Sequence, residues 1–146
     1  MEIILIVAVS SSNNGIGKNN DLLWNLPGDM KFFKSQTIGY PVITGRKNYE
    51  SIPEKFRPLT NRQNIVVTRQ NIQFEGAQTC ASIKEAIEIA KSYQKDKIFI
   101  IGGGQIYQQC LEQNLLDKLI ITWVEADIEA DVFFPILDAK WKITSK

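Results

Sequence analysis

Short apolar runs rich in Ile and Val alternate with segments of helical spacing, and this alternation constrains the fold more than any other feature of the sequence. Strands are expected in five runs, at residues 3–9, 41–44, 64–68, 97–101 and 118–124. Helices are expected between several of them, at residues 28–37, 82–93 and 105–114. The alternation predicts an α/β fold: one domain over residues 1–146, with a mostly parallel, twisted sheet flanked by helices.

Length, composition and charge exclude several classes of protein. A chain of 146 residues with 44% hydrophobic and 23% charged residues is typical of one globular domain and not of a disordered or fibrous chain. The formal net charge of +1 excludes a globally basic nucleic-acid binder. The first apolar run is too short for a membrane span and lacks the basic start of a signal peptide, so we expect a cytoplasmic protein without membrane partners.

The chain contains no histidine and two cysteines, Cys80 and Cys110. The lack of histidine excludes Ser-His-Asp and Cys-His nucleophilic sites and removes the commonest metal ligand. Two widely spaced cysteines are too few for a zinc site or a disulfide framework, so no metal is expected and both are interpreted as reduced packing residues. Catalysis must therefore depend on carboxylates, hydroxyls or a bound cofactor.

Glycines and cations follow three of the predicted strands, at the edge where an open parallel sheet binds its ligands. The triplet at 102–104 would let a backbone approach a flat ring or a pyrophosphate, although a sharp turn uses the same residues. The runs 45–48 and 68–70 combine Gly, Arg, Lys and Thr, which suit phosphate groups. Each run alone is typical of a solvated surface, but three at successive strand ends favour one extended polyanion, such as a phosphorylated dinucleotide.

Asp29 is the candidate carboxylate of the site. It is four residues before Phe33, so the two side chains share one face of the first predicted helix. An acid in a first helical turn commonly does no more than complement the helix dipole. The neighbouring Trp24 and Phe32 make this setting apolar, however, and a carboxylate there needs a partner with paired N–H donors or it would tend to protonate. The amidine edge of a pterin offers such a pair.

Four ordered segments of the sequence resemble the dihydrofolate reductase family. They are residues 24–33, 41–52 (PVITGRKNYESI), 57–65 and 100–107 (IIGGGQIY), and the resemblance extends from the first strand to the FFP at 133–135. It implies NADPH-dependent reduction of 7,8-dihydrofolate to 5,6,7,8-tetrahydrofolate, with hydride transfer to C6 and protonation at N5, supplying one-carbon metabolism. Antifolate inhibitors are expected to bind such a protein.

The resemblance also implies roles for individual residues. Asp29 would pair with the pterin, Arg62 would bind the α-carboxylate of the glutamate tail, and residues 10–23 would form a mobile loop that closes over nicotinamide. The residues implied in catalysis are Asp29, Leu22, Trp24 and Thr122. Those implied in substrate binding are Ala8, Asp29, Phe33, Ile52, Leu59, Arg62, Ile101, Tyr107 and Thr122. Those implied in cofactor binding are Ala8, Ile16, Gly17, Gly45, Arg46, Lys47, Asn48, Thr68, Arg69, Gly102, Gly103, Gly104, Gln105 and Ile106, with Arg46 and Arg69 near the 2′-phosphate.

The sequence departs from the family pattern at two places. Asn48 stands where a hydroxyl residue is usual beside the pyrophosphate, and since an amide can also donate, we expect this to change only cofactor affinity. The family continues beyond residues 141–143 into an antiparallel hairpin, whereas this sequence ends at Lys146. We therefore expect an incomplete hairpin and a monomer or a weak homodimer formed through the C-terminal edge, unless the sequence is a trimmed portion.

Two alternative functions remain at this point. A riboflavin-pathway reductase of similar fold would share the cofactor motifs, but the segment 24–33 and Arg62 favour a pterin with a carboxylate tail. A catalytically silent module that binds NADPH or folate could keep every binding motif. Turnover of dihydrofolate would separate these functions.

Overall fold

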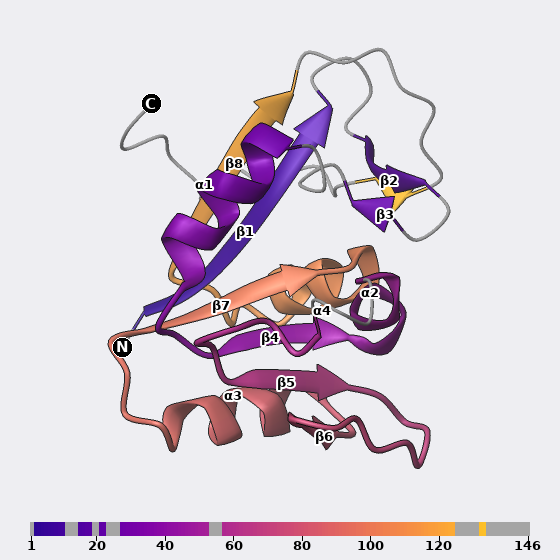
Figure 1. The fold of residues 1–146 in the computed structure, drawn as a ribbon, viewed down its shortest axis with the longest axis vertical. Coiled ribbons are helices and arrows are strands. Elements are labelled where there is room, and N and C mark those ends of the chain that lie inside the picture. The colour runs from indigo at the N-terminus through magenta and orange to yellow at the C-terminus, as the bar shows by residue number, and fades with distance from the viewer. Residues whose placement is uncertain are drawn as a thin grey trace.

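The computed structural model describes residues 2–10, 15–18, 21–22, 27–52, 57–124 and 132–133. Its main element is a six-stranded parallel sheet with the order β6-β5-β4-β7-β1-β8 (Figure 1). The strands of this sheet are β1 (Glu2–Ser10), β4 (Val42–Gly45), β5 (Asn64–Val67), β6 (Ala77–Cys80), β7 (Lys97–Gly102) and β8 (Lys118–Val124). The helices are α1 (Pro27–Thr37), α2 (Arg46–Ser51), α3 (Ile83–Lys91) and α4 (Gly104–Glu112).

A second, smaller sheet has the strand order β3-β2-β9 and is antiparallel. Its strands are β2 (Gly15–Lys18), β3 (Asp21–Leu22) and β9 (Val132–Phe133). Two of them fall within residues 10–23, so the prediction of a loop was wrong at 15–18 and 21–22. Glycine and lysine in β2 gave no apolar alternation, and pairing with β9, which is distant in sequence, forms the strand.

The predicted α/β fold with a parallel sheet is confirmed, and each of the five predicted strands is present to within one residue at either end. The edge strand β6 was missed because its residues, AQTC, are half-buried or exposed and form no apolar run. The predicted helices are present, and Ser82 caps α3 as expected, since its side chain accepts a hydrogen bond from the backbone N–H of Glu85 at 3.1 Å. The expected C-terminal hairpin lies outside the described residues.

Alternating side chains of the sheet build two apolar clusters on its opposite faces. On β1, Ile4, Ile6 and Ala8 belong to the cluster that also contains Phe33 of α1 and Tyr49 of α2. The intervening residues of β1 belong to the cluster that contains buried residues of α3 and α4. Helices α1 and α2 therefore contribute to one face of the sheet and α3 and α4 to the other.

The sheet order also determines where a ligand can bind. Strand β7 lies between β1 and β4, so the chain returns from β6 to the middle of the sheet before it reaches the opposite edge at β8. In Figure 1 the arrowheads of β4, β5 and β7 point toward the same side of the molecule, where α2 lies. The carboxyl ends of strands around such a reversal are the usual ligand site of an open α/β sheet.

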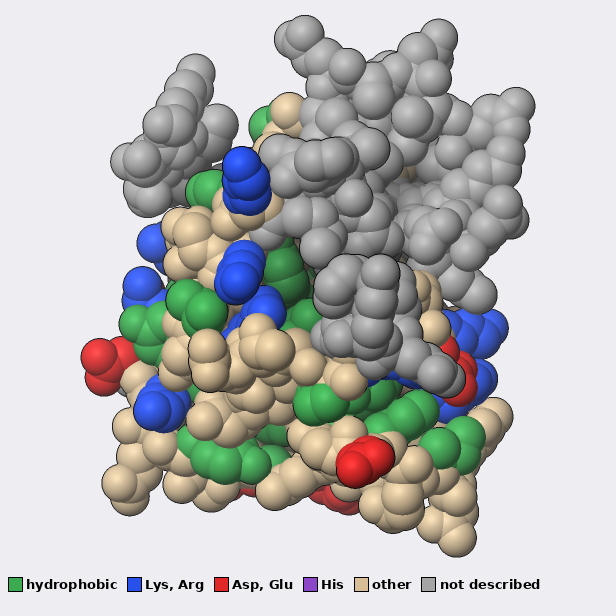
Figure 2. All heavy atoms as spheres, in the orientation of Figure 1, with side chains coloured by type: hydrophobic (Ala, Val, Ile, Leu, Met, Phe, Trp, Pro, Cys, Tyr) green, Lys and Arg blue, Asp and Glu red, His purple; other side chains and the backbone are tan. Residues whose placement is uncertain are grey.

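The charged surface and the helix lengths add two observations. Figure 2 shows Lys and Arg side chains on both the left and the right of one face, separated by neutral and hydrophobic side chains. Within the described ranges, none of the helices is long and apolar enough to cross a membrane.

Candidate active site

The residues predicted to line a pterin pocket gather on the α1 and α2 face of the sheet. One apolar cluster contains Ala8 of β1, Phe33 of α1, Ile52 after α2 and Ile101 of β7, with the half-buried Leu59 packed against it. These residues are far apart in the sequence, and the sheet order brings them together because β1 and β7 are neighbours. The structure thus unites five of the predicted pocket residues in one cluster.

The structure places Thr122 beside this cluster through the register of the sheet. Thr122 on β8 is the partner of Ala8 on β1, and partners in a parallel pair point to the same face, so Thr122 shares the face that contains Phe33. Asp29 falls in the first turn of α1, and Leu22 falls in β3. The side chains of Asp29 and Leu22, and all of Trp24, lie outside the described residues.

Arg62 is a half-buried cation at the end of this apolar cluster. Its Nε donates to the carbonyl of Thr60 at 3.0 Å, its Nη1 donates to Oγ1 of Thr37 at 3.0 Å, and its guanidinium carbon lies 5.8 Å from the centre of the Phe33 ring. Burial lowers the pKa of Arg62, although a guanidinium with so high an ordinary pKa stays charged at neutral pH. No acidic side chain within the described ranges pairs with it, so Arg62 can accept an anionic ligand.

Two residues that support Arg62 were not identified from the sequence. Thr37 is fully buried, and its hydroxyl donates to the carbonyl of Phe33 at 2.9 Å while it accepts from Arg62. Asn64 accepts from the backbone N–H of Leu59 at 2.9 Å and donates to the carbonyls of Leu59 at 3.0 Å and Arg62 at 2.9 Å. A buried Asn at the start of an apolar strand was the only sequence signal, since these contacts depend on the folded loop.

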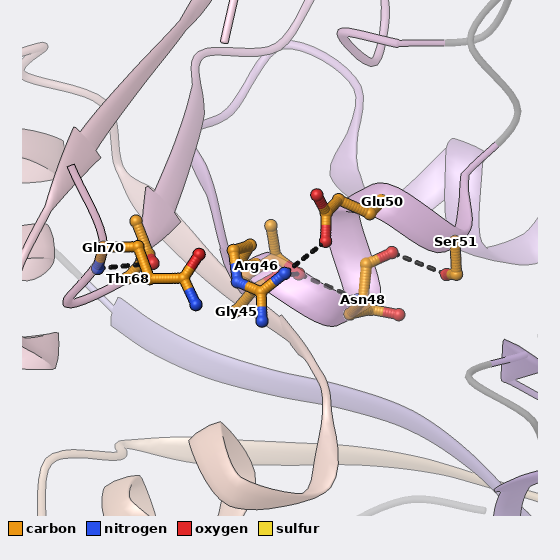
Figure 3. A network of polar contacts seen from close by, with 8 residues as sticks. Gly45, Arg46, Asn48, Glu50, Ser51, Thr68 and Gln70 are labelled. Atoms are coloured by element: carbon orange, nitrogen blue, oxygen red, sulfur yellow. Dashed lines mark hydrogen bonds and ion pairs between the residues drawn. The ribbon is translucent and has the colours of Figure 1, made fainter. Parts of the chain in front are cut away.

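The predicted phosphate-binding cations lie at the carboxyl ends of β4 and β5. Gly45 pairs with Val67 in the sheet, so the residues that follow them, Arg46 and Thr68, stand at the same edge (Figure 3). Arg46 donates through Nη1 to Oε1 of Glu50 at 2.6 Å, which leaves its other guanidinium donors for a ligand. Lys47 and Arg69 are exposed at this edge. The cations predicted from separate runs are therefore brought together.

The turn after β7 lies against the end of β4. Gly102 has φ +120°, a conformation that side chains disfavour, and the Thr44 hydroxyl donates to its carbonyl at 2.9 Å. A Cβ added to Gly45 would meet Cγ1 of Ile106 at 3.1 Å. Asn48 is buried, and its Nδ2 donates to Oγ1 of Thr44 at 2.8 Å and to the carbonyl of Ile101 at 3.3 Å. A hydrogen bond from Asn48 to a pyrophosphate would therefore require one of these bonds to break.

The remaining predicted residues fall into two groups. Gly103 and Gly104 are partly exposed at the start of α4, and Gln105 is exposed. Ile16 and Gly17 fall in β2, and the side chain of Ile16 lies outside the described part. Tyr107 is fully buried in the cluster with α3 and α4, and its hydroxyl donates to the carbonyl of Ile6 at 2.9 Å. Tyr107 thus packs on the other face of the sheet from Phe33, and burial raises the pKa of its hydroxyl.

Comparison with known proteins agrees with this arrangement. A family model described as dihydrofolate reductase matches residues 2–146. The chain belongs to the dihydrofolate reductase family. It is 41% identical over 144 residues to the dihydrofolate reductase of Haemophilus influenzae, covering 98% of this chain and 85% of that protein. It is 38% identical to the dihydrofolate reductase of Bacillus subtilis, covering 97% and 82% of the two chains.

The family also includes longer proteins. The chain is 40% identical over 148 residues to the bifunctional dihydrofolate reductase-thymidylate synthase of Daucus carota, covering 91% of this chain but 28% of that protein. The similarity therefore covers less than a third of the carrot protein. The membership accounts for the four segments of resemblance. In the structure, residues 46–52 follow β4 and residues 103–107 follow β7, at the carboxyl ends of these strands, whereas residues 57–63 precede β5.

Proposed function

We propose that this chain reduces 7,8-dihydrofolate to 5,6,7,8-tetrahydrofolate with NADPH as the hydride donor. One observation carries the proposal. An apolar cluster on one face of the sheet, here called the apolar wall, ends at a half-buried cation that has no acidic partner among the described residues. Ala8, Phe33 and Ile52 belong to the wall, and Arg62 contacts Phe33. A flat ring whose faces pack on apolar side chains and whose tail ends in a carboxylate matches both features.

The wall and its two polar ends would bind and orient the substrate. The pterin would lie against Phe33 and Ile52, and its tail carboxylate would bind Arg62 through paired N–H donors, the usual geometry of this pair. Asp29, one helical turn before Phe33, would bind the amidine edge of the pterin with support from Thr122. Fixing both ends of the substrate leaves the reacting ring in one orientation, which is the main contribution that a protein makes to a hydride transfer.

The edge formed by β4, β5 and the turn after β7 fits a phosphorylated nicotinamide dinucleotide. A Cβ at Gly45 would crowd the Ile106 side chain at 3.1 Å, and Arg46, Lys47 and Arg69 supply positive charge for phosphates. We assign the 2′-phosphate to Arg46 and Arg69, which makes NADPH the preferred cofactor over NADH. When bound, this cofactor supplies the hydride that reaches C6 of the pterin.

Protonation at N5 is assigned to water, with Asp29 as the orienting group. A carboxylate bound to the amidine edge would raise the basicity of N5 through its negative charge, and water would deliver the proton. Residues 10–23, part of which forms β2 and β3, would cover the reacting rings and limit the entry of water.

A steady-state assay with dihydrofolate and NADPH tests the proposal. We expect turnover, followed as the loss of NADPH absorbance, and a much lower kcat/KM when NADH replaces NADPH. Binding of both ligands without turnover would instead identify a silent binding module. Reduction of a riboflavin precursor in preference to dihydrofolate would favour the related reductase of similar fold.

A further inference from the structure

Asn48 completes the backbone hydrogen bonding of an irregular strand pair. The register of β4 and β7 shifts just before Thr44, which pairs with Gly102, so Ile101 has no partner opposite it on β4. An extra residue of this kind leaves its backbone polar groups without partners in the ladder. The carbonyl of Ile101 accepts instead from Nδ2 of Asn48 at 3.3 Å. A side chain of α2 thus replaces the missing strand contact.

The same amide also binds the end of β4. Its Nδ2 donates to Oγ1 of Thr44 at 2.8 Å, and the Thr44 hydroxyl has two carbonyl acceptors for its single hydrogen, that of Gly102 at 2.9 Å and that of Gly45 at 3.3 Å. Since both neighbours of Nδ2 are acceptors, the reversed orientation of the amide would place its oxygen against the carbonyl of Ile101. The network therefore joins α2, β4 and β7, and Figure 3 shows Asn48 beside Gly45 at this edge.

The other end of the Asn48 amide is buried without a partner. The residue is 5% exposed, and its Oδ1 has no hydrogen-bond partner in the described part of the chain. A buried acceptor left unpaired reduces stability, and a hydroxyl residue would avoid this cost. Stability alone therefore does not explain why this residue is an amide. Its two donated hydrogen bonds, however, connect β4 with β7 at the predicted cofactor edge.

The spacing at this edge is tight enough for a small displacement to matter. A Cβ at Gly45 would lie 3.1 Å from Cγ1 of Ile106, and a Cβ at Gly103 would lie 3.9 Å from Cβ of Asn48. The same Cβ at Gly45 would lie 4.0 Å from the carbonyl oxygen of Gly102, so the end of β4 lies against both α4 and the turn after β7, and α2 lies against that turn. Any change in the length or donors of the side chain at Asn48 would shift one against the other.

We propose that Asn48 is a positioning residue whose amide fixes the turn at Gly102 and Gly103 against the end of β4, and so sets the geometry of the cofactor edge, without donating to the pyrophosphate. The inference rests on the proposed function, because that function assigns a phosphorylated nicotinamide dinucleotide to this edge. It explains why an amide can stand where the family pattern has a hydroxyl: the amide nitrogen donates to both Ile101 and Thr44, and a hydroxyl, with one hydrogen, could donate to only one of them.

The test compares Asn48→Asp and Asn48→Thr with the unsubstituted protein and with Asn114→Asp. Asn48→Asp preserves shape but replaces two donated hydrogens by an acceptor, and Asn48→Thr introduces the hydroxyl of the family pattern. Asn114 is exposed beyond the distant end of α4, so its substitution controls for the added charge. The measurements are amide hydrogen exchange over residues 101–106 in the free protein, binding of NADP⁺ and of dihydrofolate by titration, and thermal unfolding.

We expect faster amide hydrogen exchange at residues 101–106 in both Asn48 variants. Because each variant loses hydrogen bonds that the amide donates, NADP⁺ binding should weaken about tenfold in Asn48→Asp and about threefold or more in Asn48→Thr. Dihydrofolate binding should change less than about twofold, and Asn114→Asp should match the parent. Unchanged exchange with equal or tighter NADP⁺ binding in Asn48→Thr would overturn the proposal. If Asn48→Asp does not fold, Asn48→Thr decides. A parent protein that binds no NADP⁺ would contradict the proposed function, and the exchange result would still test Asn48.

Discussion

Substitution of Thr37 by valine should weaken binding of the glutamate tail and leave chemistry at the pterin unchanged. Thr37 is fully buried, and its hydroxyl accepts from Nη1 of Arg62 at 3.0 Å. Valine has the same shape but no acceptor, so Arg62 would lose one of the two bonds that orient it. The bond from its Nε to the carbonyl of Thr60 would remain.

The magnitude follows from the charge and exposure of Arg62. A hydrogen bond to a charged group contributes about 1.5–3 kcal/mol, and the half-exposed position of Arg62 reduces this to about 1 kcal/mol through solvent screening. The Kd for dihydrofolate should therefore rise about fivefold in Thr37→Val. The kcat should remain near the parent value, because Arg62 is assigned to the tail and not to the reacting ring.

The assay uses dihydrofolate and a dihydropterin that lacks the p-aminobenzoyl-glutamate tail. Thr37→Val should raise the KM of dihydrofolate and leave that of the truncated pterin unchanged, and Thr37→Ser, which retains the hydroxyl, should restore most of the difference. In an Arg62→Ala background, Thr37→Val should have no further effect on dihydrofolate. An equal rise in KM for both substrates would refute the reasoning, because it would show general damage to α1 and not loss of Arg62 orientation.

Three further outcomes are expected. Asp29→Asn should lower kcat for dihydrofolate by about 10² to 10⁴ and leave NADP⁺ binding unchanged; a parent-like rate at neutral pH would contradict its role. Arg46→Ala or Arg69→Ala should weaken NADPH binding about tenfold and hardly change NADH binding. An equal rise in KM for both cofactors would exclude a 2′-phosphate site there. Burial raises the pKa of Cys110 from 9.0 to about 12, so its contribution to stability is complete below pH 9 and is lost as pH rises toward 12. By pH 10 the free energy of unfolding should have fallen by about 1.4 kcal/mol from this source. Denaturant unfolding of Cys110→Ala should therefore show a smaller fall in stability between pH 9 and pH 10 than the parent. An equal fall in both proteins would show that Cys110 does not titrate this way.

The sequence by itself predicted five of the strands, three of the helices and the class of the fold, because these follow from local patterns. The apolar runs that became β1, β4, β5, β7 and β8 are buried strands of parallel type, and such strands read as continuous hydrophobic stretches. The short strands β2, β3 and β9 and the edge strand β6 gave no such signal, since each owes its existence to pairing with another segment. Local propensity does not determine a strand whose partner is distant in the sequence.

The chemistry of the candidate site was also partly readable, because charged and glycine-rich runs follow strands whose carboxyl ends meet at one edge. Only the tertiary structure decided how those residues are used. It pairs Arg46 with Glu50, holds Arg62 between Thr37 and the carbonyl of Thr60, and places Tyr107 in the core away from Phe33. It also directs both amide hydrogens of Asn48 into the protein. A sequence states which donors and acceptors exist, but which of them remain for a ligand depends on the neighbours that folding brings within hydrogen-bonding distance.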